Sequence, residues 1–182
     1  MRVITGTAKG RPLETPDGLD TRPTAARVKE GIFSAIGFDI EGRRVLDLFA
    51  GSGQLGIEAL SRGAAHCVFI DRNRRAVGVV ERNLTATGLA DHATVLCGDS
   101  LAILNSQTQP FDLVFVDPPY ASGVYESCLT ALTNRVAVGG YVLCESDKQT
   151  VLPDTVGAFA LYRTYRYGQV LVRLYRREEE PV

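Results

Sequence analysis

Residues 45–56 read Val-Leu-Asp-Leu-Phe-Ala-Gly-Ser-Gly-Gln-Leu-Gly, and this stretch decides the fold class. The apolar run at its start predicts a buried strand, and the glycines allow a sharp turn and a close approach of a ligand to the backbone. A helical pattern over 55–61 follows directly. A strand, a glycine-rich loop and a helix in this order open the nucleotide-binding half of many α/β folds.

The same alternation continues along the chain from residue 43 onward. Apolar runs predict strands at 43–48, 66–70, 94–97, 111–116 and 141–144. Helical patterns fall at 55–61, 74–87, 101–104 and 125–136. Because the strands are apolar throughout, the pattern predicts a mostly parallel sheet with helices on both faces.

The C-terminal part changes character. Aromatic and β-branched runs at 158–165 and 169–176 surround Tyr167 and Gly168. They predict an antiparallel hairpin added to the edge of the sheet, which gives the main domain, residues 43–182, its last strands.

The first 42 residues form an N-terminal extension in this reading. Short runs at 3–7 and 11–14 predict a small β-hairpin. Residues 25–36 carry apolar side chains at helical spacing, which predicts a helix with Thr24 as its N-cap.

Composition limits the class of protein. The chain has 182 residues, 45% of them apolar and 23% charged, which suits one soluble domain. No run approaches the ~20 apolar residues that span a bilayer, and the N-terminus lacks a secretory signal, so we expect a cytoplasmic protein. Cys67, Cys97, Cys128 and Cys144 form no C-x-x-C pair and are expected to be buried thiols, and we predict no metal site.

Charge is distributed unevenly. The net charge of −1 excludes a protein that coats nucleic acid through bulk charge. Residues 1–29, however, carry six Lys or Arg against three Asp or Glu. They form either a local phosphate-binding surface or an ordinary solvated face.

Three acids accompany the glycine loop. Asp71 follows Gly51 by 20 residues, where a carboxylate can accept the ribose hydroxyls of either NAD or S-adenosylmethionine. Asp47 lies inside the first strand, and a buried carboxylate is costly unless it is paired. It suits a ligand with an ammonium group, which S-adenosylmethionine has, and Asp99 could accept an adenine amino group. The alternative is that Asp47 and Asp99 cap helix ends.

A second motif, Asp117-Pro118-Pro119-Tyr120, follows the predicted strand 111–116. Open α/β sheets bind ligands at this end of their strands, and two prolines remove two amide donors. The motif therefore predicts an acceptor-only cradle for the exocyclic amine of a base, with Tyr120 as a stacking face. Hydrogen bonds to Asp117 and the Pro118 carbonyl would localise the nitrogen lone pair for attack on a sulfonium methyl. The alternative is a rigid turn.

Together these residues resemble the Rossmann-like S-adenosylmethionine methyltransferases. A narrower resemblance, nearly end to end, is to the RsmD family of bacterial 16S rRNA guanine-N2 methyltransferases. It is carried by the following segments: Met1–Gly6, Lys9–Arg11, Thr21–Thr24, Arg27–Glu30 and Leu48–Gly63.

This resemblance implies a seven-stranded sheet with an N-terminal hairpin that contacts RNA. It implies methyl transfer from S-adenosylmethionine, with S-adenosylhomocysteine as product, to 16S rRNA in the small subunit or a late assembly intermediate. We expect a monomer. The expected site comprises cofactor-binding residues Asp47, Phe49, Ala50, Gly51, Ser52, Gly53, Asp71, Asp99 and Ser100, catalytic residues Asp117, Pro118, Pro119 and Tyr120, and RNA-binding residues Lys9, Arg11, Arg22, Thr24 and Arg27. The family often has Glu at Asp71 and an acid at Asn73, so the ribose contact here is expected to be looser.

Other functions compete with this interpretation. The main alternative is a DNA adenine or cytosine amino-methyltransferase, although 182 residues leave little room for a target-recognition region. A protein-glutamine methyltransferase typically has Asn at the position of Asp117. A nicotinamide-dependent oxidoreductase would use Gly51-x-Gly53-x-x-Gly56, and a non-catalytic RNA-binding assembly factor would not need the residues 117–120 intact.

Overall fold

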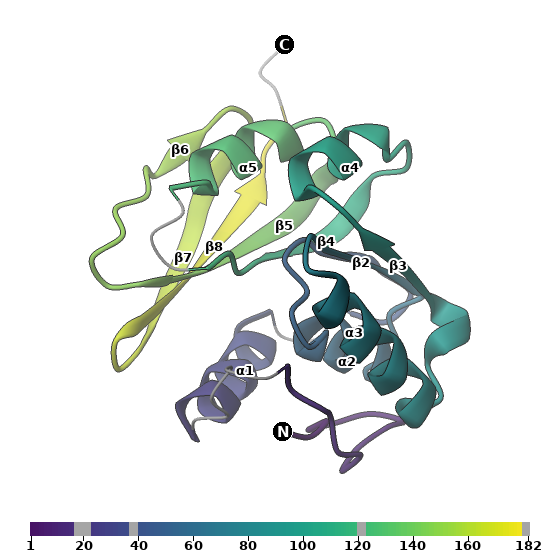
Figure 1. Ribbon diagram of the computed structural model, residues 1–182. Helices are drawn as coiled ribbons and strands as arrows, with labels where there is room; N and C mark the ends of the chain where they lie inside the picture. Colours follow the sequence, from purple (N-terminus) through teal and green to yellow (C-terminus); the bar gives the residue numbers. More distant parts are fainter. Residues whose placement is uncertain (17–22, 37–39, 120–122, 180–182) are drawn as a thin grey trace.

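The structure, a computed structural model, describes residues 1–16, 23–36, 40–119 and 123–179. Eight strands form one sheet (Figure 1). Their order is β3 (Ala93–Cys97), β2 (His66–Asp71), β1 (Arg44–Asp47), β4 (Phe111–Val116), β5 (Val136–Asp147), β8 (Val170–Arg177), β7 (Phe159–Tyr167) and β6 (Thr155–Val156). The first five are parallel, and β8, β7 and β6 are antiparallel additions, which confirms the mostly parallel sheet and the C-terminal hairpin. The eighth strand is the two-residue β6.

Helices cover both faces of the sheet (Figure 1). One face carries α1 (Pro23–Ile36), α2 (Gln54–Ser61) and α3 (Arg74–Thr87), and the other carries α4 (Ser100–Ser106) and α5 (Tyr125–Leu132). A short 3-10 helix, η1 (Ala90–His92), precedes β3. Alternate strand residues feed the two cores, so that Val45 packs under α1–α3 and Leu46 under α4 and α5.

Two sequence predictions fail around β5. The predicted helix 125–136 ends at Leu132, and the strand predicted at 141–144 begins already at Val136. Gly139 adopts φ +77°, and the register of β4 against β5 shifts between Phe111 and Leu113. Glycine is unusual inside a strand, so the sequence pattern of this irregular segment did not predict where β5 begins.

The edge strand β3 also departs from expectation. None of its five residues is fully buried, because β3 lies at the edge of the sheet with one neighbouring strand. Cys97, predicted to be a buried thiol, is consequently exposed, whereas Cys67, Cys128 and Cys144 are buried. The prediction of strands that are apolar and buried throughout is therefore wrong for β3.

The N-terminal segment forms a looser hairpin than predicted. Its only β-bridge in the described residues joins Arg2 and Pro12. Val3, Ala8 and Leu13 are buried in the core that α1–α3 share. Helix α1 begins at Pro23, a residue favoured at the first helical position, so Thr24 lies within the helix and is not its N-cap.

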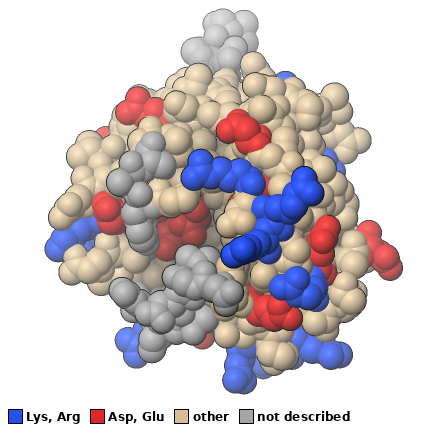
Figure 2. Space-filling view, in the orientation of Figure 1, with Lys and Arg blue, Asp and Glu red and all other residues tan. Residues whose placement is uncertain are grey.

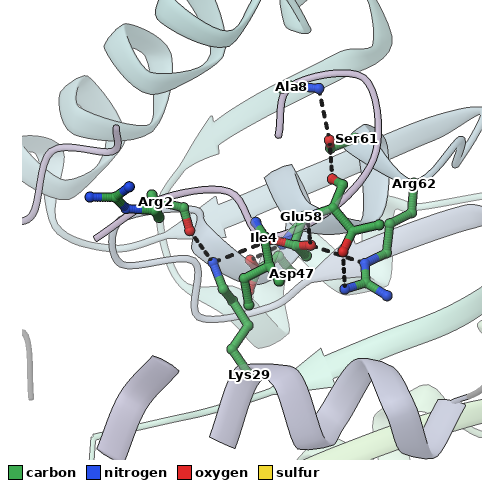
Figure 3. Close-up of polar contacts among 10 residues, drawn as sticks. Arg2, Ile4, Ala8, Lys29, Asp47, Glu58, Ser61 and Arg62 are labelled. Atoms are coloured by element: carbon green, nitrogen blue, oxygen red, sulfur yellow. Dashed lines mark hydrogen bonds and ion pairs between the residues drawn. The ribbon is translucent and has the colours of Figure 1, made fainter. Parts of the chain in front are cut away.

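A buried ionic cluster fastens this segment to α2 (Figure 3). Glu58 accepts hydrogen bonds from the backbone N–H groups of Ile4 (2.8 Å) and Thr5 (3.0 Å) and from Arg62 Nε (3.0 Å). Lys29 of α1 reaches the same carboxylate at 3.4 Å and donates to the Arg2 carbonyl at 2.8 Å. The cluster thus joins the N-terminal segment, α1 and α2.

Candidate active site

Three carboxylates meet at the carboxyl ends of neighbouring strands. Asp47 ends β1, Asp117 follows the last residue of β4, and Glu145 lies near the end of β5. Glu145 stands opposite Val172, which packs in the core under α1. Asp117 is two residues beyond Phe115 of that same core, so the alternation of the strand directs both acids toward the α1 side.

Burial dominates the electrostatics of these acids. The Asp47 side chain is 2% exposed, and loss of water raises its pKa to about 8 although the Gly56 N–H donates to Oδ2 at 3.0 Å. Burial likewise raises the pKa of Asp117, and burial together with the charge of Asp117 raises that of Glu145. Among the described residues, no Lys or Arg forms an ion pair with any of the three acids, so burial is not offset there by a counter-ion.

The sequence analysis missed Glu145. Its only signal was an acid one position beyond the predicted strand 141–144, and its closeness to Asp117 depends on the pairing of β4 with β5. The Tyr125 hydroxyl donates to the Glu145 carbonyl at 2.7 Å, which anchors the backbone at this point.

The glycine loop lies against the ends of β1 and β2. Gly51 has φ +54°, its N–H donates to Asp71 Oδ2 at 2.8 Å, and a Cβ there would meet nothing within 4 Å. The outer side of the loop is therefore open to a ligand. The other predicted loop residues are in place around it: Phe49 is half-buried, and Ala50, Ser52 and Gly53 are buried.

Asp99 and Ser100 lie at the start of α4. Asp99 is exposed, and its Oδ1 accepts from the Ala102 N–H at 2.9 Å, so it is an N-cap, as the alternative interpretation had it. Its other oxygen has no partner among the described residues. Asp47 likewise accepts from an N–H of the first turn of α2, that of Gly56, which the same alternative predicted. Ser100 is buried and donates to the Leu48 carbonyl at 2.8 Å, which ties α4 to the end of β1.

The two prolines follow Asp117 directly. Pro118 is buried and Pro119 is exposed, and neither offers a backbone donor. Tyr120 lies outside the described residues, so its stacking role stays a prediction. Figure 2 shows acidic side chains recessed near the centre of this face, with Lys and Arg side chains grouped beside them.

The predicted RNA-binding residues are partly visible. Lys9, Arg11 and Arg27 are exposed, Arg22 lies outside the described residues, and Thr24 is placed only by the backbone of α1. Lys29, which the sequence analysis counted in the basic block, is 2% exposed and cannot contribute to a basic surface.

The hydrogen-bond acceptors of the site fit a cationic nucleoside ligand. A buried, uncompensated Asp47 suits an ammonium group, the open loop at Gly51 allows close approach, and Asp71 at the end of β2 can accept hydroxyl groups. This fold with this site defines an S-adenosylmethionine-dependent methyltransferase.

The chain belongs, more narrowly, to the RsmD family. The family model described as "Conserved hypothetical protein 95" matches residues 1–176. "Ribosomal RNA small subunit methyltransferase D" of Escherichia coli strain K12 is 37% identical, with 99% of this chain and 91% of the relative covered. YlbH of Bacillus subtilis strain 168, provisionally named an rRNA methyltransferase, is 42% identical over 97% of this chain and 99% of its own length.

Solved structures agree with this assignment. The structure of yhhF from Escherichia coli is 38% identical, covers 99% of both chains and has a TM-score of 0.88. The structure of SMU.776, complexed with SAH, shares the fold with a TM-score of 0.69 at 12% identity, covering 82% of this chain and 48% of that one.

Proposed function

We propose that this enzyme methylates the exocyclic N2 of a guanine in 16S rRNA, within the small ribosomal subunit or a late assembly intermediate. The names of the relatives support ribosomal RNA of the small subunit as substrate. The observation that carries the choice of guanine is the pair of acids, Asp117 and Glu145, at the ends of β4 and β5. The enzyme acts in the cytoplasm as a monomer.

Asp117 and the Pro118 carbonyl activate the amine. The lone pair of an exocyclic base amine is delocalised into the ring and is a poor nucleophile. Hydrogen bonds from its two N–H groups to a carboxylate and a carbonyl pull the nitrogen toward tetrahedral geometry, and the carboxylate then stabilises the positive charge that develops on nitrogen. The missing N–H groups of Pro118 and Pro119 keep this cradle free of competing donors.

Glu145 supplies the selectivity for guanine. The Watson–Crick edge of guanine presents the N1–H donor beside the N2 amine, whereas adenine presents an N1 acceptor beside its N6 amine. Two adjacent carboxylates match the donor–donor edge and repel a donor–acceptor edge. A polar site of this kind discriminates strongly, because the wrong base leaves a buried group unpaired.

The cofactor residues complete the proposal. Asp47 holds the ammonium of the methionine moiety, Asp71 accepts from the ribose hydroxyls, and Asp99 accepts from the adenine amino group. Residues 49–53 and Ser100 line the same site. The bound cofactor supplies an electrophilic methyl group on a sulfonium. Asp117 accepts the released proton or passes it to water.

A methyl-transfer assay tests this function. Small subunits from cells that lack the gene are incubated with the protein and labelled methyl donor, and the product is mapped as N2-methylguanosine. Asp117→Ala should keep cofactor binding in calorimetry and lower the rate about 10²–10³-fold. Transfer only to duplex DNA, the main alternative, or a product on an adenine, would overturn the proposal.

Glu145→Ala separates base reading from cofactor binding. We expect a large loss of kcat/KM for the RNA with unchanged cofactor affinity. The matched control is Glu126→Gln, at an exposed position of α5, which should behave as wild type. Normal activity of Glu145→Ala with a guanine product would remove Glu145 from the site and leave Asp117 as the sole acid at the amine.

The N-terminal segment acts as an RNA arm in this proposal. Exposed Lys9 and Arg11 lie at its turn, and Thr24 and Arg27 lie near the start of α1. Arg22, which is outside the described residues, belongs to the same predicted set. Replacing Lys9 and Arg11 by Ala should weaken subunit binding and flatten its salt dependence. Equal affinity of wild type and variant at every salt concentration would show that Lys9 and Arg11 do not contact the RNA.

A further inference from the structure

Four aromatic and basic side chains form a connected array on β5 and β7, far along the sheet from the glycine loop. Tyr141 and Tyr162 make an edge contact with ring centroids 5.8 Å apart. The Arg163 guanidinium lies 5.6 Å from the Tyr162 ring centroid, and its Nη1 donates to the Tyr165 hydroxyl at 3.4 Å. We call these four residues the tyrosine array.

A β-bulge aims the array outward. Leu161 pairs with Tyr175 and Arg163 with Leu174, so Tyr162 is an extra residue in β7. A bulge re-aims the side chain that it inserts, and Tyr162 is 52% exposed. Arg163 is also exposed, and Arg176, which pairs with Tyr141 across β8 and β5, adds a second exposed cation.

The array lies on the same face of the sheet as the three acids. Tyr141 and Tyr165 pack against the core under α1, and Glu145, Val172 and Tyr165 form one row across β5, β8 and β7. At ~4.8 Å between strands, Tyr165 is about 10 Å from Glu145, and Tyr162 lies three residues, about 10 Å, further along β7. These distances suit nucleotides that flank a target base.

We propose that the tyrosine array binds single-stranded RNA next to the target nucleotide, an inference that rests on the proposed function. The exposed Tyr162 ring stacks on a base, and Arg163 and Arg176 contact phosphates. Tyrosine and arginine planes are the surfaces on which unpaired bases stack, and the two cations complement the charge of the RNA backbone. A protein partner is less well matched, because Tyr162 is the array's one strongly exposed aromatic and offers no apolar core of the size that protein interfaces bury.

Binding measurements with matched variants test the array. Small subunits and a short single-stranded RNA are titrated with protein loaded with S-adenosylhomocysteine, at several salt concentrations. Tyr162→Ala should weaken binding of both about 5- to 100-fold, and Tyr162→Phe should preserve it because stacking remains. Arg163→Gln should lower the slope of log K against log salt by about 0.7 for its phosphate contact.

Arg166→Gln is the matched control. Arg166 is exposed on the same strand but points to the opposite face, between Tyr165 and Tyr167. It should bind as wild type, and all variants should keep cofactor affinity and melting temperature. An equal effect of Arg163→Gln and Arg166→Gln, or normal binding by Tyr162→Ala, would refute the proposal that the tyrosine array binds RNA.

Failure of the array is distinguishable from failure of the proposed function. If wild type methylates a guanine of the subunit while Tyr162→Ala binds normally, only the array is wrong. If wild type modifies another RNA and still needs Tyr162, the array stands and the substrate is wrong. Loss of a ribosomal protein contact in Tyr162→Ala, with RNA binding intact, would replace RNA by protein as the occupant.

Discussion

Lys29 Nζ lies 3.4 Å from Glu58 Oε2, and the two side chains are only 2% and 0% exposed. Burial lowers the pKa of Lys29, and the charge of Glu58 opposes this effect. A buried charge is tolerated only where partners surround it, and here they come from the N-terminal segment, α1 and α2. The pair therefore determines where the helix that carries Arg27 meets the domain.

Removing one member of this pair should be costly. Glu58→Ala leaves Lys29 without its counter-ion and the N–H groups of Ile4 and Thr5 without their acceptor, and we expect the free energy of unfolding to fall by ~3–5 kcal/mol. The matched control is Glu14→Ala, which breaks an exposed 2.9 Å ion pair with Arg82 and should cost ~0–1 kcal/mol. Denaturant titration compares the two, and equal losses would show that burial of the Lys29–Glu58 pair contributes nothing.

Asp47 should lower stability as the pH rises when no cofactor is bound. Its folded pKa of about 8 lies above the ordinary 3.8, so the folded state holds its proton more tightly than the unfolded state. The resulting stability is present at low pH and is lost as the pH rises from about 4 to about 8, at up to ~1.4 kcal/mol per pH unit.

The Asp47→Asn variant should consequently bind S-adenosylmethionine more weakly than wild type and be more stable at high pH. We expect the variant to gain ~1–3 kcal/mol over wild type at pH 8.5 and nothing near pH 4, where the protonated acid resembles the amide. Saturating S-adenosylmethionine at 100 times its Kd should restore ~2.7 kcal/mol to wild type only. Thermal melts at both pH values check this. A variant less stable than wild type at pH 8.5 would contradict the conclusion that burial of the ionised Asp47 destabilises the protein.

The pH profile of methyl transfer should report the pair of acids. Burial raises the pKa of Asp117 to about 7 and that of Glu145 to about 8, and only the ionised carboxylate offers the base two acceptor oxygens and a negative charge. Because both acids must be ionised, the value of kcat/KM for RNA should rise about tenfold per pH unit between about 7 and 8, more steeply below about 7, and level off above about 8. Glu145→Gln should move the rise to lower pH by removing the neighbouring charge, whereas Asp91→Asn on η1 should not move it. A flat profile between pH 5 and 9 would mean that neither acid titrates in the free enzyme.

Local sequence rules predicted the elements whose ends carry their own signals. Helix α3 has the predicted bounds, Arg74–Thr87, because Asn73 caps it by accepting from the Arg75 N–H and Gly88 ends it at φ +73°. Strand β1 was predicted for the same reason, since its apolar run leads into the glycine loop.

Contacts between distant residues were beyond those rules. Lys29 was counted in the sequence analysis among the surface cations of residues 1–29, and its burial depends on Glu58, 29 residues away, and on the backbone of Arg2. The place of Glu145 in the site depends on the pairing of β4 with β5, in a strand whose glycines disguised its start. Tertiary pairing, which leaves no local pattern, decided both.

Gly31 should be essential for seating α1 against the tip of β7. A Cβ at this position would lie 2.2 Å from the Tyr167 ring, so Gly31→Ala forces the ring or the helix to move. Alanine normally stabilises a helix by ~0.5–1 kcal/mol over glycine, and the overlap should reverse the sign to a loss of ~1–3 kcal/mol. Gly78→Ala in α3 is the control, since its Cβ would meet only the Arg82 side chain at 3.4 Å, and it should be stabilising.

Tyr167→Leu should recover part of the loss in the double variant, because the shorter side chain vacates the space that the methyl group needs. A double-mutant cycle with no coupling between positions 31 and 167 would mean that α1 is held by its Lys29 and Phe33 contacts alone.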